Sequence, residues 1–416
     1  MGVMMTIPRD IKSQVFSVGC IDWDRRLFDE LIPLPDGTSY NSYLVKGCEK
    51  VALVDTVNPP FVDVLMENLG RLDVDVLDYV VVNHAEQDHS GSLPLIHDRY
   101  PKAEVIVTPR CKELLMSHLH LPSDVFKVVG DGDTLSLGDK TLKFVYTPWV
   151  HWPETMSTYL VEDGILFSCD FFGSHMATSN LFADPFTVYE PAKSYYAQIM
   201  MPFRKIITKN MDKLDELDLE IIAPSHGPLY SDPNFIMDAY RDWTSEDVNN
   251  QVVIPYTSMH GSTKKMVEHL VCSLMERDIE VQQFNLSQLD LGKLAMALVD
   301  AATLVVGTCT FLAGPHPLSA HAAFLVNALR PKLKFVSVVG SYGWGGKTVE
   351  VLQGMIPNLK AEMLDPVLAK GQPNDEDFEA LDKLADQILK KHEELNLQSR
   401  TMVETVSYTH LTLPTN

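Results

Sequence analysis

Short apolar runs recur between residues 40 and 230, each of strand length and bordered by turn-forming residues. Such runs predict β-strands at Val51–Asp55, Tyr79–Val82, Val105–Val107, Leu142–Tyr146, Ile165–Phe167 and Ile221–Ile222. Between some of them, at 61–69 and 111–119, apolar residues recur with helical spacing. We therefore expect sheets with helices packed on their outer faces.

After Asp247 the pattern changes to a regular alternation of strand and helix. Strands are predicted at 251–256, 280–284, 303–307 and 334–340, and helices at 264–275 and 375–395. This alternation is typical of a doubly wound α/β domain with a parallel sheet. We place the boundary near residue 248, which gives domains at 1–248 and 249–398 and a Thr-rich tail at 399–416 outside both.

The composition fits two globular domains in the cytoplasm. A length of 416 residues is enough for two cores, and a net charge of −22 argues against binding to nucleic acid or to a membrane surface. The six cysteines form no C-x-x-C pair, which indicates a reducing compartment and excludes a rubredoxin module. Residues 1–12 lack the apolar core of a secretory signal.

The uncharged stretch Ala301–Leu329 is long enough to be mistaken for a membrane span. Because Gly314–Pro317 interrupts it, we interpret it as strand, loop and helix.

Four potential metal ligands follow the predicted strand at 79–82 within six residues: His84, Glu86, Asp88 and His89. A polar helix cap formed by Asp88 or Ser90 would also explain this loop. Three further residues of ligand type are predicted at strand ends, namely His151, Asp170 and His226. Their shared position favours a metal site over a capping loop.

Seven nitrogen and oxygen ligands are more than one tetrahedral ion accepts, so the pattern indicates two metal ions with a carboxylate between them. Asp170 is the best candidate for this bridge. Three carboxylates without a thiolate make an oxygen-rich site that suits iron or manganese better than structural zinc.

The sequence His84-x-Glu86-x-Asp88-His89, with its downstream ligands, resembles the metallo-β-lactamase fold. In hydrolases of that fold the second motif position is usually histidine and the metals are usually zinc, whereas this chain has Glu86. With a flavodoxin-like domain behind it, the pattern is similar to that of the flavodiiron proteins, also called A-type flavoproteins. The resemblance spans about residues 10–395 and includes Thr38–Tyr43, His151–Pro153 and Ala223–Gly227. It implies an α/β chain with an N-terminal metallo-β-lactamase-like αββα sandwich and a C-terminal flavodoxin-like doubly wound parallel sheet.

The resemblance also implies a role for each candidate ligand. One iron would be held by His84, Glu86 and His151, the other by Asp88, His89 and His226, and Asp170 would bridge them. His175 and Tyr196 match two further family residues that could donate a proton or hydrogen bond to a metal-bound oxygen. For each of these two, a buried hydrogen-bonded role in the core is an equally good interpretation.

Three loops at strand ends predict a cofactor site in the second domain. The first comprises Ser258, Met259, His260, Gly261, Ser262 and Thr263, and it begins a helix. Its hydroxyl and N–H groups suit a phosphate, although a simple N-cap would also explain it. The second loop contains Thr310 and Phe311, and the third contains Ser341, Tyr342, Gly343, Trp344 and Gly345. The dinucleotide fingerprint G-x-G-x-x-G is missing, and the three loops resemble those that bind FMN in flavodoxin.

Two positions in these loops depart from the family pattern. His260 stands where relatives often have a bulky aromatic residue, and Leu312–Gly314 is more apolar than the middle loop usually is. We expect FMN binding to survive both changes.

The implied activity is that of an oxidoreductase in which reduced FMN passes electrons to two non-haem iron ions. There dioxygen would be reduced to water, or nitric oxide to nitrous oxide. The family implies a head-to-tail homodimer, or a dimer of dimers, and an external electron donor such as rubredoxin or a reduced deazaflavin. A zinc-dependent hydrolase with an attached flavodoxin module is the main alternative, and a pure electron carrier with a degenerate metal site is the second.

Overall fold

The computed structural model describes residues 6–288 and 291–397, and the predicted tail at 399–416 lies outside this range. The chain divides into two compact units between Ser245 and Glu246. Each unit has its own sheets and its own buried core, so the two are described separately.

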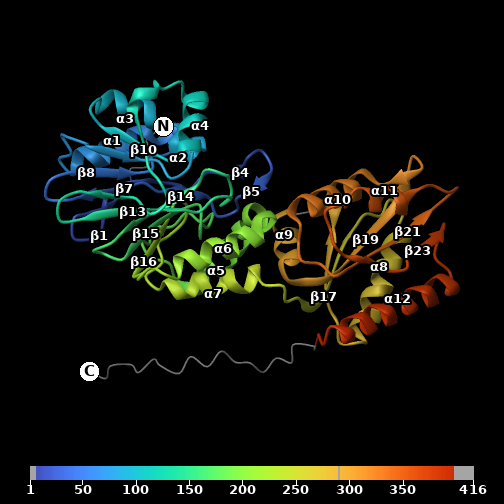
Figure 1. The fold of residues 1–416 in the computed structure, drawn as a ribbon. Helices are drawn as coiled ribbons and strands as arrows, with labels where there is room; N and C mark the ends of the chain where they lie inside the picture. The colour runs from blue at the N-terminus through green and yellow to red at the C-terminus, as the bar shows by residue number, and fades with distance from the viewer. Residues whose placement is uncertain (1–5, 289–290, 398–416) are drawn as a thin grey trace, which may run out of the picture. The chain divides into compact units, whose positions relative to one another are not determined.

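The first unit is built on two sheets (Figure 1). In spatial order, the seven-stranded sheet contains β1 (Arg9–Lys12), β2 (Val15–Ser17), β7 (Tyr43–Lys46), β8 (Val51–Val54), β9 (Tyr79–Val81), β10 (Glu104–Val107) and β11 (Phe126–Val128). Strands β8 to β11 run parallel, and Val54 pairs with Val81. Since β8 and β9 end level with each other, the loops that follow them begin side by side.

The five-stranded sheet contains β12 (Thr134–Ser136), β13 (Thr141–Tyr146), β14 (Met156–Leu160), β15 (Ile165–Cys169) and β16 (Ile221–Pro224). Its strands pair antiparallel except β15 and β16, which are parallel with Phe167 opposite Ala223. Two short pairs complete the unit: β3 (Cys20–Asp22) with β6 (Thr38–Tyr40), and β4 (Leu27–Phe28) with β5 (Ile32–Pro33). The parallel pair brings the residues after β15 and β16 to the same edge.

Helices cover the outer faces of both sheets. The seven-stranded sheet packs against α1 (Val62–Arg71), α3 (Leu93–Arg99) and α4 (Pro109–Leu119), while α5 (Pro185–Tyr195), α6 (Arg204–Leu214) and α7 (Pro233–Thr244) lie along the other side (Figure 1). Between the sheets, apolar side chains such as Val54, Phe144 and Phe167 form a continuous core. This layering confirms the predicted αββα sandwich.

The second unit has one parallel sheet in the order β18 (Glu280–Asn285), β17 (Asn249–Tyr256), β19 (Ala301–Phe311), β21 (Phe335–Tyr342), with β22 (Glu362–Met363) and β23 (Val367–Lys370) both paired to β21. In chain order this is 2-1-3-4-5, the flavodoxin order, so the predicted doubly wound fold is confirmed. Helices α8 (Ser262–Met275) and α12 (Asp375–Glu394) cover one face of the sheet. The other face is covered by α9 (Leu291–Asp300), α10 (Pro317–Leu329) and α11 (Thr348–Gly354).

The uncharged stretch Ala301–Leu329 forms β19, the short strand β20 (Gly314–Pro315) and α10, as predicted. None of the helices in the described part of the chain combines the length and apolar character that a bilayer crossing requires. The stretch is apolar because β19 is the central strand of a sheet that is covered on both faces.

The sequence predicts His151 at a strand end, but β13 ends at Tyr146 and the residues between Tyr146 and His151 form no strand. Pro148 lacks a backbone N–H and Trp149 has a φ of 65°, and neither fits a paired strand. His151 therefore lies in the loop between β13 and β14 rather than at a strand end.

Candidate metal centre and cofactor loops

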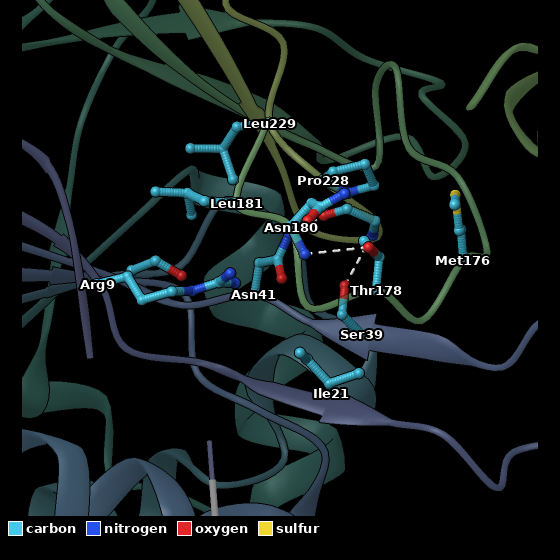
Figure 2. Close-up of a pocket in the computed structure, with 12 residues that line it drawn as sticks. Arg9, Ile21, Ser39, Asn41, Met176, Thr178, Asn180, Leu181, Pro228 and Leu229 are labelled. Carbon is cyan, nitrogen blue, oxygen red and sulfur yellow. Dashed lines mark hydrogen bonds between the residues drawn. The ribbon is translucent and has the colours of Figure 1, made fainter. Parts of the chain in front are cut away.

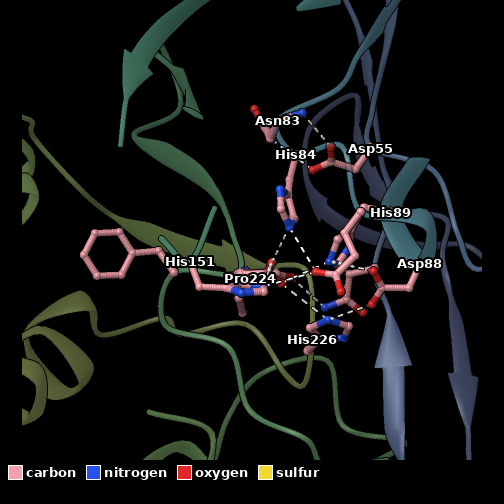
Figure 3. Close-up of polar contacts among 12 residues, drawn as sticks. Asp55, Asn83, His84, Asp88, His89, His151, Pro224 and His226 are labelled. Atoms are coloured by element: carbon pink, nitrogen blue, oxygen red, sulfur yellow. Dashed lines mark hydrogen bonds and ion pairs between the residues drawn. The ribbon is translucent and has the colours of Figure 1, made fainter. Parts of the chain in front are cut away.

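The seven candidate ligands come from four segments that meet at one edge of the two sheets (Figure 3). His84 and Glu86 lie in the turn after β9, and Asp88 and His89 lie in the one-turn helix α2 (Gln87–Ser90) that follows. Asp170 directly follows β15. His226 comes two residues after β16, and His151 comes from the loop after β13.

The carboxylate of Asp170 lies between two sets of side chains. Its Oδ2 is 3.4 Å from His84 Nε2 and 3.5 Å from His151 Nε2. Its Oδ1 is 3.1 Å from His89 Nε2 and 3.4 Å from His226 Nε2. We call these sets the His84 group (His84, Glu86, His151) and the His226 group (Asp88, His89, His226).

Short distances also hold each group together. Glu86 Oε2 lies 3.1 Å from the Nε2 atoms of both His84 and His151. Asp88 uses one oxygen toward His89 Nε2, at 3.3 Å, and the other toward His226 Nε2, at 3.2 Å. All four imidazoles thus present Nε2 to carboxylate oxygens, which is the geometry of ligands around bound cations.

The hydrogen-bonding state of these buried atoms fits metal ligation. Within the described residues, both oxygens of Asp88 and Asp170 and both ring nitrogens of His89 are buried without a hydrogen-bond partner. Buried polar atoms without partners are costly unless something else satisfies them. The capping interpretation fails, because Asp88 lies inside α2 and the Ser90 hydroxyl donates to Ala85 O at 2.7 Å.

The side chains of the centre form carboxylate–imidazole pairs. Burial acts against a charged imidazole, but hydrogen bonds to Glu154 and Glu86 raise the pKa of His84 to about 10. Burial likewise opposes charge on His89, whose pKa Asp88 and Asp170 nevertheless raise to about 9. Burial would raise the pKa of Asp170, yet His89 and His151 hold it well below the usual range. A cation that binds here takes the place of the imidazole protons.

The structure also brings Cys169 close to the centre, which the sequence did not predict. Its Sγ belongs to a group of possible ligand atoms, with His89 and Asp170, that lie within 4.8 Å of one another. Burial, and next the charge of Asp170, raise the pKa of the Cys169 thiol well above its ordinary range. The thiol therefore stays protonated and is a poor ligand beside the available carboxylates.

Two buried carboxylates that sequence reasoning missed hold the loop after β9. Asp55 follows β8 and accepts hydrogen bonds from Asn83 N at 2.8 Å and Asn83 Nδ2 at 2.9 Å. Glu154 accepts a hydrogen bond from His84 Nδ1 at 2.8 Å. Their sequence signals were weak: Asp55 is the last residue of a predicted strand, and Glu154 lies three residues beyond His151.

His175 lies next to the His226 group, with its ring centroid 5.0 Å from that of His226. Its Nδ1 is 3.0 Å from Thr38 Oγ1, and its Nε2 is buried without a hydrogen-bond partner in the described structure. Burial, and next the neighbouring His226, lower the pKa of His175 well below its ordinary value. His175 is therefore neutral near pH 7.

Of the two adjacent tyrosines, the structure places Tyr195 rather than Tyr196 against the site histidines. Tyr196 donates its hydroxyl to Trp243 O at 3.1 Å and packs against Tyr240 and Trp243. The ring of Tyr195 lies 4.8 Å from His175 and 5.9 Å from His226. Burial, and next Asp170, raise the pKa of Tyr195 well above its usual range. These contacts agree with the buried core role that the sequence analysis leaves open for Tyr196, and they make Tyr195 a further candidate beside the site.

A small pocket lies on the far side of the His226 ring from the carboxylates. His226 Nδ1 donates to Ser39 O at 2.7 Å, and Ser39 lines this pocket together with Arg9, Asn41, Thr178 and Asn180 (Figure 2). The cavity volume of about 10 Å³ is close to the minimum for one water molecule. The hydrogen bond from His226 to Ser39 holds the His226 ring beside this pocket. The pocket itself is too small to be a substrate site.

The three predicted cofactor loops lie at the carboxyl ends of adjacent parallel strands. The first loop follows β17. The strands β19 and β21 are longer than the sequence predicts, so Thr310 and Phe311 are the last residues of β19, and Ser341 and Tyr342 are the last residues of β21. These strand ends lie on both sides of the point where the strand order reverses. This is the position at which doubly wound sheets bind their ligands. Thr263 Oγ1 lies 3.0 Å from Ser341 Oγ, which ties the first loop to the third.

The first loop is shaped for a phosphate. Ser258 Oγ accepts hydrogen bonds from Gly261 N at 3.1 Å and Lys264 N at 3.2 Å. Gly261 has a φ of 88° and directly precedes α8, so the loop lies at a helix N-terminus, where a negative charge is favoured.

Large apolar side chains are exposed around the same loops, namely Met259, Phe311, Leu312 and Trp344. Trp344 is 85% exposed. Exposed aromatic residues beside a phosphate cradle fit a planar ring with one phosphate, which is the chemistry of FMN.

Comparisons with known proteins agree with both halves of this description. The family model of the ODP family beta lactamase matches residues 38–227, and the flavodoxin model matches residues 254–383. Both matches leave out the residues around the division between Ser245 and Glu246.

Whole-length relatives are also found. A nitric oxide reductase from Moorella thermoacetica is 36% identical, over 86% of this chain and 92% of that protein. A coenzyme F420H2 oxidase from Methanothermobacter marburgensis is 34% identical, over 92% of this chain and 100% of that protein. The solved structure of rubredoxin:oxygen oxidoreductase from Desulfovibrio gigas superposes with a TM-score of 0.90 at 30% identity, and covers 94% of this chain and 100% of that one.

Proposed function

The chain belongs to the flavodiiron proteins, and we propose that it uses electrons from FMN to reduce dioxygen to water, nitric oxide to nitrous oxide, or both, at a non-haem diiron centre. Both gases are proposed because its relatives include a nitric oxide reductase and a rubredoxin:oxygen oxidoreductase. The ligands and their surroundings decide which chemistry dominates.

One iron would be held by the His84 group and the other by the His226 group, with Asp170 shared between the two groups. The observation that carries this assignment is that the two oxygens of Asp170 face different groups. One carboxylate can therefore serve two ions at once. Glu86 at the second motif position distinguishes the site from that of the zinc hydrolases.

When bound, the iron pair supplies two adjacent positions for the gas and its electrons, and FMN supplies those electrons. The surrounding side chains supply protons and exclude water. If the Thr38 hydroxyl donates to His175 Nδ1, the neutral His175 ring carries its proton on Nε2, beside the His226 group. Tyr195 keeps its phenolic proton at neutral pH and is a second donor on the same side.

FMN would be held by the three segments at the carboxyl ends of β17, β19 and β21. Ser258–Thr263 would bind its phosphate, Thr310 and Phe311 would contact it from the middle segment, and Ser341–Gly345 would contact its ring. His260 and Leu312, which depart from the family pattern, lie where they would influence the flavin potential.

The electron donor is a separate molecule, either rubredoxin or a reduced deazaflavin, in keeping with relatives that are named for rubredoxin and for coenzyme F420H2. The active form is a head-to-tail homodimer, or a dimer of such dimers, in the cytoplasm. All six cysteines are free, which suits a reducing compartment. A monomer that retains full turnover on dilution would refute the dimer.

The deciding experiment measures iron, zinc and FMN per subunit together with the consumption of each gas. Two irons and one FMN, with gas consumption driven by reduced rubredoxin or deazaflavin, are expected. Less than one iron, with zinc in its place and hydrolysis of an ester or lactam, would indicate a hydrolase instead. As a local test, Asp170→Asn should abolish gas reduction and leave FMN bound. The substitution removes the negative charge of the one ligand that both ions would share.

A further inference from the structure

The loop between β13 and β14 supports two histidines of the His84 group. It contains His151 itself, and it also contains Glu154, whose Oε1 lies 2.8 Å from His84 Nδ1. Glu154 Oε1 accepts a second hydrogen bond from Ala85 N at 3.1 Å, and neither side chain of the Glu154–His84 pair has exposed surface. Trp152 from the same loop packs edge-on against the His84 ring, with centroids 4.9 Å apart. The position and tilt of that ring are therefore fixed.

The histidines of the His226 group have no comparable carboxylate at Nδ1. His226 Nδ1 donates to a backbone carbonyl, Ser39 O, at 2.7 Å. His89 Nδ1 is buried without a hydrogen-bond partner among residues 6–288 and 291–397. A carboxylate acceptor raises the basicity of a ligating imidazole and adds negative charge behind it, whereas a neutral carbonyl adds no such charge.

We propose that Glu154 is a positioning residue that makes the two metal positions unequal, because it strengthens the binding of one ion through His84. This proposal rests on the ligand assignment given above. An ion in the His84 group would have Glu86, a share of Asp170 and the charge of Glu154, which is hydrogen-bonded to His84. An ion in the His226 group would have Asp88 and a share of Asp170, while the buried Asp55 acts on His89 through space and without a hydrogen bond to it. The two positions therefore fill in separate steps, the His84 group first.

The test is a Co²⁺ titration of the full-length, FMN-containing protein from which metal has been removed, followed by the visible absorption of bound Co²⁺. Two ions with distinguishable affinity are expected for the unmodified protein. Glu154→Gln should weaken the tighter step roughly 10- to 100-fold, leave the other step unchanged, and alter the absorption of only the first ion. Glu154→Gln should also add little to His84→Ala, because the carboxylate acts through that ring.

Asp55→Asn is the matched control. Asp55 is another buried carboxylate at the same edge, but it is bonded to Asn83 and not to a histidine. Equal weakening by Asp55→Asn and Glu154→Gln, or equal weakening of both steps by Glu154→Gln, would overturn the proposal, since either result indicates a general effect of buried charge. If Glu154→Gln does not fold, Glu154→Asp is tested in its place, because it keeps the charge on a shorter side chain. Glu154→Asp should weaken the same binding step by a smaller factor. Unchanged affinity for that ion in Glu154→Asp would then count against the proposal.

The titration also separates this inference from the ligand assignment. Failure of the unmodified protein to bind two ions would refute the assignment. Two ions bound normally by Glu154→Gln would refute only the role of Glu154.

Discussion

The ring of Tyr195 packs edge-on against the ring of His175, with centroids 4.8 Å apart and planes inclined by 67°. Tyr195→Phe keeps this ring contact and removes only the hydroxyl, so it should affect chemistry more than folding. We expect Tyr195→Phe to lower gas turnover roughly tenfold or more, because a buried proton donor is lost. Iron and FMN content should stay unchanged, and turnover with each gas is the measurement.

The neighbouring residue provides the control. Tyr196→Phe removes a hydrogen bond to Trp243 O and should lower the free energy of unfolding by about 1 kcal/mol with little change in turnover. If Tyr196→Phe lost turnover while Tyr195→Phe did not, Tyr196 and not Tyr195 would be the proton donor.

The phosphate loop allows a backbone test at Gly261. This residue has a φ of 88°, and nothing lies within 4 Å of the place a Cβ would take. Gly261→Ala should therefore act through backbone strain of about 1–2 kcal/mol and not through a clash. FMN affinity, measured by flavin fluorescence, should fall roughly 5- to 30-fold.

Gly354→Ala is the corresponding control, because Gly354 also has open space around it but lies at the end of α11. Its FMN affinity should match that of the unmodified protein. Equal affinity in both variants would mean that the Gly261 loop does not hold the phosphate.

The interface between the sheets offers a stability test. Phe167 is 1% exposed and its ring lies 5.0 Å from that of Tyr43 on the opposite sheet. Phe167→Ala should cost about 3–5 kcal/mol in the free energy of unfolding, because it leaves a cavity in the central core. Val76 is 62% exposed, so Val76→Ala should change stability by less than about 0.5 kcal/mol. Denaturant unfolding of both variants checks the contrast.

Much of the fold is predictable because its strands are buried. Runs such as Tyr79–Val82 are continuously apolar, since they lie between a helical layer and a second sheet. The pair β4 and β5 could not be predicted, because two-residue strands are too short to show a period. That pair nevertheless matters, as it carries Phe28, whose ring lies 5.1 Å from that of His175.

The candidate site also contains residues that the sequence predicts and residues that it does not. His84 and Asp170 stand out in the sequence because histidines and carboxylates at the ends of apolar runs have few structural explanations, and the structure brings them together. Tyr195 and Tyr196 could not be separated, because adjacent helical residues differ by about 100° in direction and only the packing decides which one faces the site. Glu154 was missed because its partner, His84, lies 70 residues earlier in the chain.

His392 gives a pH-dependent prediction for the second unit. It lies near the end of α12 and is 1% exposed. Its Nε2 is 2.7 Å from Thr303 Oγ1, and its Nδ1 is 2.7 Å from Asn250 Oδ1, so it ties the helix to β19 and β17. Burial lowers the pKa of His392 from 6.5 to about 4. The folded protein therefore holds this ring neutral at a pH where the unfolded chain has protonated it.

Because the pKa of His392 is lower in the folded protein than in the unfolded chain, acid should destabilise the second unit. Above pH 6.5 both states are neutral and the contribution to stability is fully present, and it is lost as pH falls from 6.5 toward 4 because the unfolded chain binds the proton first. The loss should reach about 3 kcal/mol. His392→Gln should be less stable at pH 7, by about 1–2 kcal/mol, because its hydrogen bonds are poorer.

The stabilities of the two proteins should become equal between about pH 5 and 6, and the original protein should be the less stable one near pH 4, since only the original side chain acquires a proton. Denaturant unfolding at a series of pH values, followed by FMN release as a signal from the second unit, measures this difference. A gap between the two proteins that stays constant from pH 7 to pH 4 would show that His392 does not titrate in the way its burial requires.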